Sequence, residues 1–245
     1  MTLDSAVRII ALAPDLLGTY GDAGNVTVLA QRLRWRGFPT EVVEGIGRDV
    51  PDSGDIYVLG GGEDGPQALA AREMIESGAL PRAVERGAVI FGVCAGYQLL
   101  GCSFLDTDDN VHAGLGLLDC TTVRGTGPRN VGEVVANIGT LLPGHVLSGF
   151  ENHGGVTTVG GGATPLATIV AGNGNGDGSH TEGAWSGRVV GTYLHGPVLA
   201  RNPDLADLLL EWVVGPSAPL ADADATAEAL RAERIQAAGG SRRRA

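Results

Sequence analysis

Cys94 lies in the stretch of this sequence that most clearly predicts chemistry. An apolar run over Ala88–Val93 predicts a buried strand, and a short helix through Leu100 is expected to begin directly after Cys94. A strand that ends at Gly-x-Cys-x-Gly and turns at once into a helix is a nucleophile elbow, here with cysteine in place of serine. The N-terminus of the helix favours a thiolate at this position. We therefore predict that Cys94 is the nucleophile of an acyl-transfer reaction.

The small residues around this cysteine have roles that the turn itself predicts. Side chains at Gly92 and Gly96 would collide with the neighbouring strand and helix, because the turn is sharp. The backbone N–H of Ala95 is expected to point to the place where an oxyanion forms during acyl transfer.

The alternative for Cys94 is that it is a small buried hydrophobic residue, which is the usual fate of a free cysteine. The elbow favours the catalytic interpretation. Cys102 and Cys120 have no such context, and we assign both to structure. Three cysteines, an odd number, do not indicate a disulfide framework.

His195 is the histidine best placed to act as a base for Cys94. It ends a predicted strand over Val189–Leu194, and Gly196-Pro197 prevents that strand from continuing. In an open α/β sheet, chemistry collects outside the carboxyl ends of the strands, and Cys94 shares that edge. The remaining histidines have weaker settings, and three of them lie in predicted loops: His112, His145 and His180.

A triple glycine, Gly60-Gly61-Gly62, follows the predicted strand Asp55–Leu59. Glycines let backbone N–H groups approach a ligand closely, and we expect the Gly61 region to supply a second oxyanion donor. A phosphate-binding loop is the alternative, but no Gly-Lys-Ser/Thr follows and the chain contains no lysine.

Strands and helices alternate over the first hundred residues, which predicts a doubly wound, mostly parallel α/β sheet with right-handed crossovers. The predicted elements are strands over Val7–Ala13, Thr40–Val43, Asp55–Leu59 and Ala88–Val93 and helices over Asn25–Trp35 and Pro66–Ser77, with a closing helix over Asp204–Val214. Beyond about Gly114, short β-type runs are expected to extend the sheet with antiparallel strands: Thr121–Arg124, Val131–Asn137, Ala167–Val170 and Val189–Leu194. We predict one domain over residues 1–215 and a tail over 216–245, with one helix at Ala223–Ala238 and otherwise disordered.

Composition limits the function classes that remain. The 245 residues are 43% hydrophobic and 18% charged, which is typical of a folded, soluble chain. A net charge of −11 argues against nucleic acid as a partner. All 17 basic residues are arginine, so neither a lysine Schiff base nor a Walker lysine is available. No apolar run approaches the ~18 residues of a membrane span, and we expect a cytoplasmic protein without direct membrane insertion.

Several motifs resemble one enzyme family. The elbow Gly92–Gln98, the loop Gly60–Gly62 and His195 together resemble the class I, triad-type glutamine amidotransferases, whose fold is flavodoxin-like. A narrower resemblance is to the glutaminase subunits of lipid II isoglutaminyl synthase, relatives of the cobyric acid synthase amidotransferases. It rests on three further motifs, in the right order across about Val7–Val214: Pro14–Asn25, Phe150–Gly155 and Tyr193–Pro197.

The resemblance implies a substrate and further residues that bind it. The substrate is glutamine, and Gln98 is implied to help hold it. Arg129 is implied to reach the α-carboxylate of glutamine, with which an arginine can form a bidentate pair. Asn152 belongs to a stretch that resembles the lining of the glutamine pocket in related enzymes. A solvated loop charge is the alternative for Arg129, and an ordinary loop is the alternative for Asn152.

Pro197 marks a departure from the wider family. Many triad amidotransferases carry a glutamate two residues after the histidine, where this chain has Pro197. The resemblance implies that in this branch the partner subunit supplies the third group, and the chain alone should then be a poor glutaminase. An acid elsewhere in the chain is the alternative.

The predicted reaction is hydrolysis of glutamine to glutamate and ammonia, with Cys94 as nucleophile and His195 as general base and acid. The sequence shows no ATP site, and we expect no metal or cofactor in this subunit. Free ammonia needs an activated acceptor, so a partner is implied. By resemblance it is a Mur-ligase-like synthetase that uses ATP and magnesium to activate the D-glutamate of lipid II for amidation, in a heterodimer at the inner membrane face.

Three other functions remain open. The chain could be another Cys-His hydrolase with the same elbow, of the dienelactone hydrolase or DJ-1 kind. It could be a binding subunit that has kept the fold without the activity. Within the favoured class, an amidotransferase serving a cobyrinate-type acceptor is the runner-up.

Overall fold

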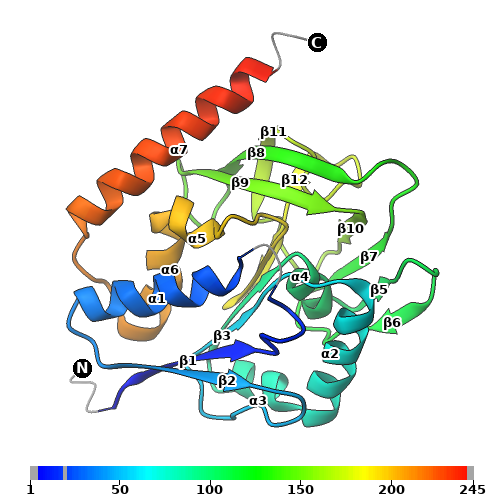
Figure 1. Ribbon diagram of the computed structural model, residues 1–245, viewed down its shortest axis with the longest axis horizontal. Coiled ribbons are helices and arrows are strands. Elements are labelled where there is room, and N and C mark those ends of the chain that lie inside the picture. The colour runs from blue at the N-terminus through cyan, green and yellow to red at the C-terminus, as the bar shows by residue number, and fades with distance from the viewer. Residues whose placement is uncertain (1–4, 19–20, 242–245) are drawn as a thin grey trace.

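A six-stranded, mostly parallel sheet forms the centre of the molecule (Figure 1). The computed structural model describes residues 5–18 and 21–241, with side chains described up to 238. The strands lie in the order β13-β14-β4-β3-β1-β2, and only β13 runs antiparallel to its neighbour. Their bounds are β1 Val7–Leu12, β2 Thr40–Gly45, β3 Ile56–Leu59, β4 Val89–Val93, β13 Ala184–Ser186 and β14 Val189–Thr192. The predicted doubly wound α/β fold is confirmed.

Burial explains why these runs form the middle of the sheet. Every residue of β3, β4 and β14 is buried, as expected for apolar strands that are covered on both faces. Helices α1, α5 and α6 pack beside one another, and helices α2, α3 and α4 form a second group (Figure 1). The helices are α1 Ala23–Trp35, α2 Asp64–Ser77, α3 Ala79–Glu85, α4 Ala95–Leu100, α5 Val198–Arg201 and α6 Pro203–Val214.

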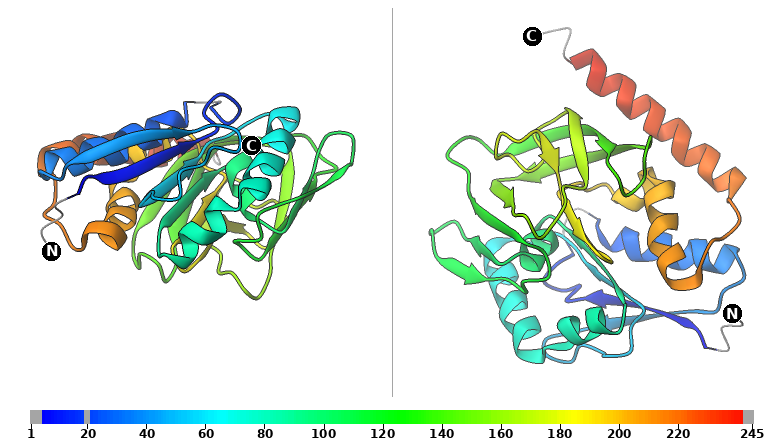
Figure 2. Two further views of the ribbon diagram at one scale, coloured as in Figure 1. Left: turned by 90° about the horizontal axis from the view of Figure 1, so that it is seen from below. Right: turned by 180° about the vertical axis from the view of Figure 1, so that it is seen from behind.

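The remaining strands form two separate four-stranded sheets, β10-β7-β5-β6 and β12-β11-β8-β9. Both lie at the end of the molecule away from β2 (Figures 1 and 2). Their bounds are β5 Ser103–Leu105, β6 Val111–Ala113, β7 Cys120–Arg124, β8 Asn130–Ile138, β9 Val146–His153, β10 Gly155–Val159, β11 Ala167–Ala171 and β12 Thr181–Glu182.

The prediction that these runs extend the central sheet is therefore wrong for Thr121–Arg124, Val131–Asn137 and Ala167–Val170. The run Val189–Leu194 does join the central sheet, but β14 pairs with β4 in parallel. The short strand β13 occupies the outer edge of β14, and the strands between β4 and β13 pair among themselves.

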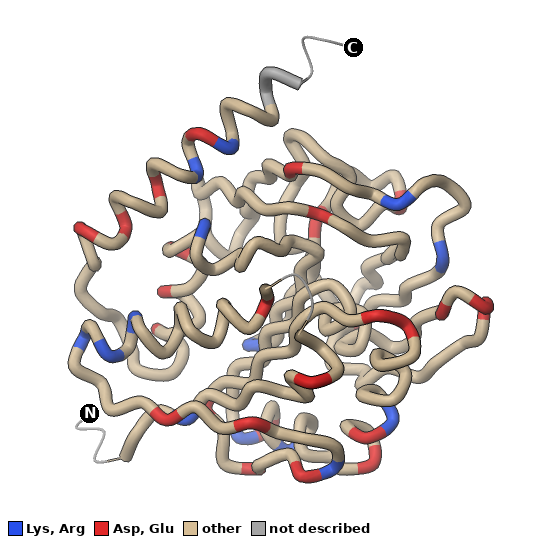
Figure 3. The backbone as a smooth tube through the Cα atoms, in the orientation of Figure 1, with Lys and Arg blue, Asp and Glu red and all other residues tan. Residues whose placement is uncertain are grey.

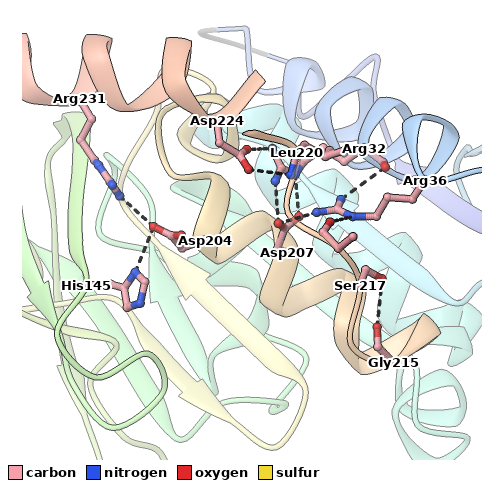
Figure 4. A network of polar contacts seen from close by, with 11 residues as sticks. Arg32, Arg36, His145, Asp204, Asp207, Gly215, Ser217, Leu220, Asp224 and Arg231 are labelled. Atoms are coloured by element: carbon pink, nitrogen blue, oxygen red, sulfur yellow. Dashed lines mark hydrogen bonds and ion pairs between the residues drawn. The ribbon is translucent and has the colours of Figure 1, made fainter. Parts of the chain in front are cut away.

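The tail folds into helix α7, Ala221–Ser241, so the predicted helix at Ala223–Ala238 is confirmed and is longer than expected. Two ion pairs attach it to the body of the molecule (Figure 4). Asp224 contacts Arg32 of α1 at 2.7 Å, and Arg231 contacts Asp204 of α6 at 3.1 Å. Residues 242–245, at the end of the tail, lie outside the described residues.

Charged residues are distributed over the whole described chain. Figure 3 shows the arginines scattered among acidic residues along the backbone. In the part of the chain that the structure describes, no helix is both long and apolar enough to cross a membrane.

Candidate active site

Cys94 occupies a strained turn between β4 and α4. Its backbone angles, φ 52° and ψ −105°, are rarely adopted by a residue with a side chain. A Cβ on Gly92 would lie 2.7 Å from Leu100 Cδ1 of the helix, and a Cβ on Gly96 would lie 2.6 Å from Leu59 of the neighbouring strand. The collisions expected at both glycines are confirmed, and the strand–cysteine–helix turn has the geometry of a nucleophile elbow.

The structure brings His195 to this cysteine, as predicted from the shared sheet edge. The Cys94 side chain is hydrogen bonded to the His195 imidazole. The Cys94 amide donates to Thr192 O at 2.8 Å, which ties the elbow to the end of β14. The His195 amide donates to Phe150 O at 2.8 Å, and the residue is 1% exposed. Two residues that are 101 positions apart therefore form one buried pair.

A carboxylate of the same chain lies on the other side of the imidazole. Asp22 Oδ2 is 2.9 Å from His195 Nδ1, and Asp22 is 1% exposed. The prediction that the acid comes from a partner is corrected here, because Asp22 orients the imidazole from within the chain. Asp22 lies between the end of β1 and the start of α1, at the same sheet edge as Cys94 and His195, and this position was the signal in the sequence that could have identified it. Thr19 and Tyr20, of the same motif, lie outside the described residues.

The surroundings of His195 favour an imidazolium. Burial by itself lowers its pKa, but the hydrogen bonds with Asp22 and with Cys94 outweigh burial and raise the pKa to about 10. An imidazolium beside a sulfur can form an imidazolium–thiolate pair during acyl transfer. Such a pair can attack a carbonyl carbon with the sulfur and protonate a leaving group with the ring.

A cavity of about 360 Å³ opens in front of Cys94. Its walls come from the elbow, the start of α2, the β5–β6 hairpin and the loop before β8. Residues that line it include Gly62, Cys94, Ala95, Gln98, Arg129, His153 and Gly154. The volume is enough to hold a small amino acid.

Of the two predicted oxyanion donors, Ala95 lies at the cavity, whereas the Gly61 amide is bound elsewhere. Ala95 lines the cavity next to Cys94, where its amide was expected. The Gly61 amide instead donates to Asp22 Oδ2 at 2.8 Å, so the prediction that it faces the oxyanion is wrong. Gly62 does line the cavity, and a Cβ added there would lie 3.7 Å from the Ala95 Cβ. The second donor in the triple glycine is therefore better sought at Gly62.

Gln98 lies on the cavity wall and is held from two sides. Gln67 Nε2 donates to Gln98 Oε1 at 2.8 Å, and Gln98 Nε2 donates to Tyr193 Oη at 3.1 Å. Tyr193 also stacks on His153, with ring centroids 3.7 Å apart. Gln67 was not predicted from the sequence, and Tyr193 was noted only as part of the motif Tyr193–Pro197, because a supporting contact between side chains leaves no pattern in a single sequence.

Arg129 and Asn152 form one unit. Arg129 lines the cavity, and its guanidinium donates to Asn152 Oδ1 at 3.1 Å and to Asn152 O at 2.9 Å. Asn152 is the support of the arginine, whereas its neighbours His153 and Gly154 form the wall. The contact between Arg129 and the substrate stays a prediction. Asn152 would act indirectly, by holding the guanidinium of Arg129 in place.

The other two cysteines lie away from this cavity. Cys120 is 3% exposed, and burial raises the pKa of its thiol to about 12. Cys102 is exposed and contacts Leu118 O at 3.7 Å. Among the described residues, no group of three histidine, cysteine or acidic side chains is arranged to hold a metal ion.

Comparison with known proteins places this geometry in a family. The profile of the CobB/CobQ-like glutamine amidotransferase domain matches residues 8–203. The chain is 38% identical over 203 residues to the lipid II isoglutaminyl synthase (glutamine-hydrolyzing) subunit GatD of Staphylococcus aureus, covering 80% of each chain. It is 30% identical to the subunit of the same name from Streptococcus pneumoniae, covering 82% of this chain and 77% of that one.

Solved structures show the same fold. A crystal structure of a glutamine amidotransferase matches 85% of this chain and 100% of its own, with a TM-score of 0.60 at 20% identity. The structure of PurLQS from Thermotoga maritima matches 86% of this chain and 98% of its own, also with a TM-score of 0.60, at 18% identity.

Proposed function

The chain belongs to the CobB/CobQ-like glutamine amidotransferases, and on that premise we propose that it is a glutamine-hydrolysing subunit with the triad Cys94, His195 and Asp22. The observation that carries the proposal is the chain of contacts from the Asp22 carboxylate through the His195 imidazole to the Cys94 sulfur, at the wall of a cavity of about 360 Å³. A nucleophile, a base and one acid that orients the base are sufficient for acyl transfer from an amide, so the triad needs no further histidine or acid.

The first half of the reaction forms a thioester. The Cys94 thiolate attacks the carbonyl carbon of the glutamine side-chain amide, and the carbonyl oxygen becomes an oxyanion that accepts hydrogen bonds from the Ala95 and Gly62 amides. The His195 imidazolium gives its proton to the amide nitrogen, which leaves as ammonia when the C–N bond breaks.

The second half hydrolyses the thioester. His195, now neutral, takes a proton from water, and the resulting nucleophile attacks the thioester carbonyl. The C–S bond breaks, glutamate leaves, and the imidazolium–thiolate pair is restored. Asp22 keeps the Nδ1 proton in place through both halves, so that Nε2 always faces the sulfur.

Substrate orientation follows from the cavity wall. Arg129 pairs with the α-carboxylate of glutamine, with its guanidinium already fixed by Asn152. Gln98, fixed by Gln67 and Tyr193, holds the substrate near the elbow. Both side chains are oriented before substrate arrives, which reduces the entropy lost on binding.

The proposed acceptor is the D-glutamate of lipid II, which a Mur-ligase-like partner activates with ATP and magnesium and this subunit supplies with ammonia. Two relatives that match about four fifths of this chain carry the name of the glutamine-hydrolyzing subunit of lipid II isoglutaminyl synthase. The proposal includes action in the cytoplasm, at the membrane face that carries the lipid-linked substrate.

A cobyrinate-type acceptor is the second candidate. The chain is 34% identical over 168 residues to a probable cobyric acid synthase of Methanoregula boonei, but it covers only 32% of that protein. The protein that co-purifies with this chain distinguishes the two acceptors: a Mur-ligase-like synthetase supports lipid II, and a cobyrinate-binding synthetase supports the second candidate.

The direct test of the activity is release of ammonia from glutamine by the purified chain, with a simple carboxylic ester as control substrate. The proposal expects ammonia from glutamine and negligible ester hydrolysis. Ester hydrolysis without glutaminase activity would instead favour the Cys-His hydrolases. If neither substrate is consumed and a glutamine analogue does not label Cys94, the chain is a binding subunit.

A further inference from the structure

The segment that carries His195 leaves the central sheet before it reaches the active site. Strand β14 ends at Thr192, and of the next three residues only His195 pairs with another strand, through its bridge to Phe150 of β9. A buried N–H group needs an acceptor, because an unsatisfied one costs as much as a lost hydrogen bond. The acceptors used by Tyr193, Leu194 and His195 therefore show what holds this segment in place.

Two of these three amides depend on side chains. The Leu194 amide donates to Thr192 Oγ1 at 3.1 Å, and the His195 amide donates to Phe150 O. The Tyr193 amide donates to Glu182 Oε1 at 3.1 Å. The Thr192 hydroxyl donates to the same carboxyl oxygen. The carboxyl group of Glu182 thus replaces a strand partner on the β13 side of β14, where pairing ends at Gly191.

Glu182 is an unusual residue to find at this place. It is fully buried, at 0% exposure, at the end of the two-residue strand β12. Burial raises the pKa of its carboxyl group to about 7, although the bonds from Thr192 and Tyr193 oppose that rise. The titratable groups that face it are Glu151 of β9 and Tyr97 of α4, and both are acids. A buried carboxyl group without a basic partner among the described residues is costly, and such costs are typically kept at functional sites.

Thr192 connects this carboxyl group to both members of the reacting pair. Its carbonyl oxygen accepts the Cys94 amide at 2.8 Å. Its hydroxyl donates to Glu182 and accepts the Leu194 amide, one residue before His195. A displacement of Thr192 would therefore move the sulfur and the imidazole relative to each other.

We propose that Glu182 is a positioning residue of this active site, which acts through Thr192 and Tyr193 to set the distance and angle between Cys94 and His195. It touches neither substrate nor reacting atoms. The inference rests on the proposed function. A misplacement of about 1 Å between reacting groups is enough to lower a rate by about 100-fold. Loss of the hydrogen bonds from Thr192 and Tyr193 to Glu182 is therefore expected to lower kcat.

The test compares Thr192→Val, which removes the hydroxyl and keeps the shape, with Thr192→Ser, which keeps the hydroxyl. Glutamine hydrolysis by Thr192→Val is expected to fall by about 10- to 100-fold in kcat, with KM changed by less than about threefold, because the groups expected to bind substrate are untouched. Thr192→Ser is expected to recover most of the rate. Thr158→Val, on an exposed position of β10, is the matched control and should leave kcat unchanged.

Glu182 itself is tested by a double-mutant cycle. Glu182→Ala should lower kcat by at least as much, and the double variant with Thr192→Val should lose little more than Glu182→Ala alone, since Thr192→Val removes one of the two hydrogen bonds that Glu182→Ala removes. Additive losses, or a wild-type kcat in Thr192→Val, would overturn the proposal. If Glu182→Ala does not fold, the comparison of the two Thr192 variants still decides.

A readout without turnover separates this inference from the proposed function. The proton on His195 Nδ1, between the ring and Asp22, is expected to give a far-downfield NMR signal, because it lies in a hydrogen bond to a buried carboxylate that is shielded from solvent. The signal should shift or vanish in Thr192→Val and persist in Thr158→Val. An unchanged signal in Thr192→Val contradicts positioning even if the chain hydrolyses no glutamine, whereas a changed signal without any activity contradicts only the proposed function.

Discussion

Asp22→Asn is the substitution that best separates this account from one in which a partner orients His195. The side chain is buried, and its Oδ2 accepts from the Gly61 amide at 2.8 Å and lies 2.9 Å from His195 Nδ1. Asparagine has the same shape, so the fold should persist. It lacks the charge, and its amide nitrogen can turn toward His195 and impose the wrong tautomer, with a proton on Nε2 already facing the sulfur.

The size of the loss follows from burial of both partners. The side chains of Asp22 and His195 are 0% and 2% exposed, so solvent screens their interaction very little. Removing one partner of such a buried pair costs about 3–5 kcal/mol. At about 1.4 kcal/mol for each factor of ten, kcat/KM for glutamine should fall by about 10²- to 10⁴-fold.

The pH dependence of the rate should also change in Asp22→Asn, in a direction that the pKa of His195 determines. The pKa of His195 is raised from 6.5 to about 10, so the imidazolium persists until the pH rises through about 10. Loss of the negative neighbour destabilises the imidazolium and lowers that pKa. The alkaline limb of the rate profile in Asp22→Asn should therefore move to lower pH.

The assay is ammonia release from glutamine by the purified chain without a partner, from pH 6 to 10.5, for wild type and Asp22→Asn. Asp224→Asn, an acid of α7 bound to Arg32 far from the cavity, is the matched control and should keep the wild-type rate. A rate for Asp22→Asn within about threefold of wild type, with an unmoved alkaline limb, would refute the role of Asp22. The partner would then remain the source of the third group.

Four further substitutions test substrate binding, the structural role of the other two cysteines and the attachment of α7. Arg129→Ala should raise KM for glutamine and lower kcat/KM by about 10- to 100-fold, the loss typical of a charged hydrogen bond, while the exposed Arg34→Ala changes neither; an unchanged KM would make Arg129 a solvated loop charge. Cys102→Ser and Cys120→Ser should keep glutaminase activity within about threefold, but the buried Cys120→Ser should lower the free energy of unfolding by about 1–3 kcal/mol in urea denaturation. Asp224→Ala should lower the free energy of unfolding by about 1–2 kcal/mol, because Arg32 keeps Asp207 but loses its contact with α7, and proteolysis of α7 should become faster; equal proteolysis rates would show that the ion pair does not hold the helix.

The part of the site that could be predicted from the sequence is the part whose position is set by the ends of strands. Cys94 and His195 each follow a buried strand of a parallel sheet, so their types and positions suffice to bring them to one edge. The Gly92 and Gly96 collisions follow from the same turn. These features depend on local pattern and on topology, which a single sequence carries.

The contacts of Asp22 and Gly61 and the pairing of the antiparallel strands were not predicted, because the sequence is compatible with several arrangements of each. Asp22 and His195 are 173 positions apart, and only the packed structure shows which acid of the edge reaches the ring. The direction of the Gly61 amide is set by that same Asp22, so the error at Gly61 and the missing third residue have one cause. The antiparallel strands were recognised as strands, but their pairing into separate sheets depends on β13, a strand of three residues that closes the edge of the central sheet.

Attack of Cys94 on glutamine is tested by the rate of ammonia release from glutamine by Cys94→Ala beside the wild-type chain. The substitution removes only the sulfur from a residue that is 7% exposed, so the circular dichroism spectrum and melting temperature should stay close to those of wild type. We expect a loss of at least about 10³-fold in kcat, because the triad has lost its nucleophile. Release by folded Cys94→Ala at more than about 1% of the wild-type rate would contradict the assignment of the nucleophile and the mechanism built on it.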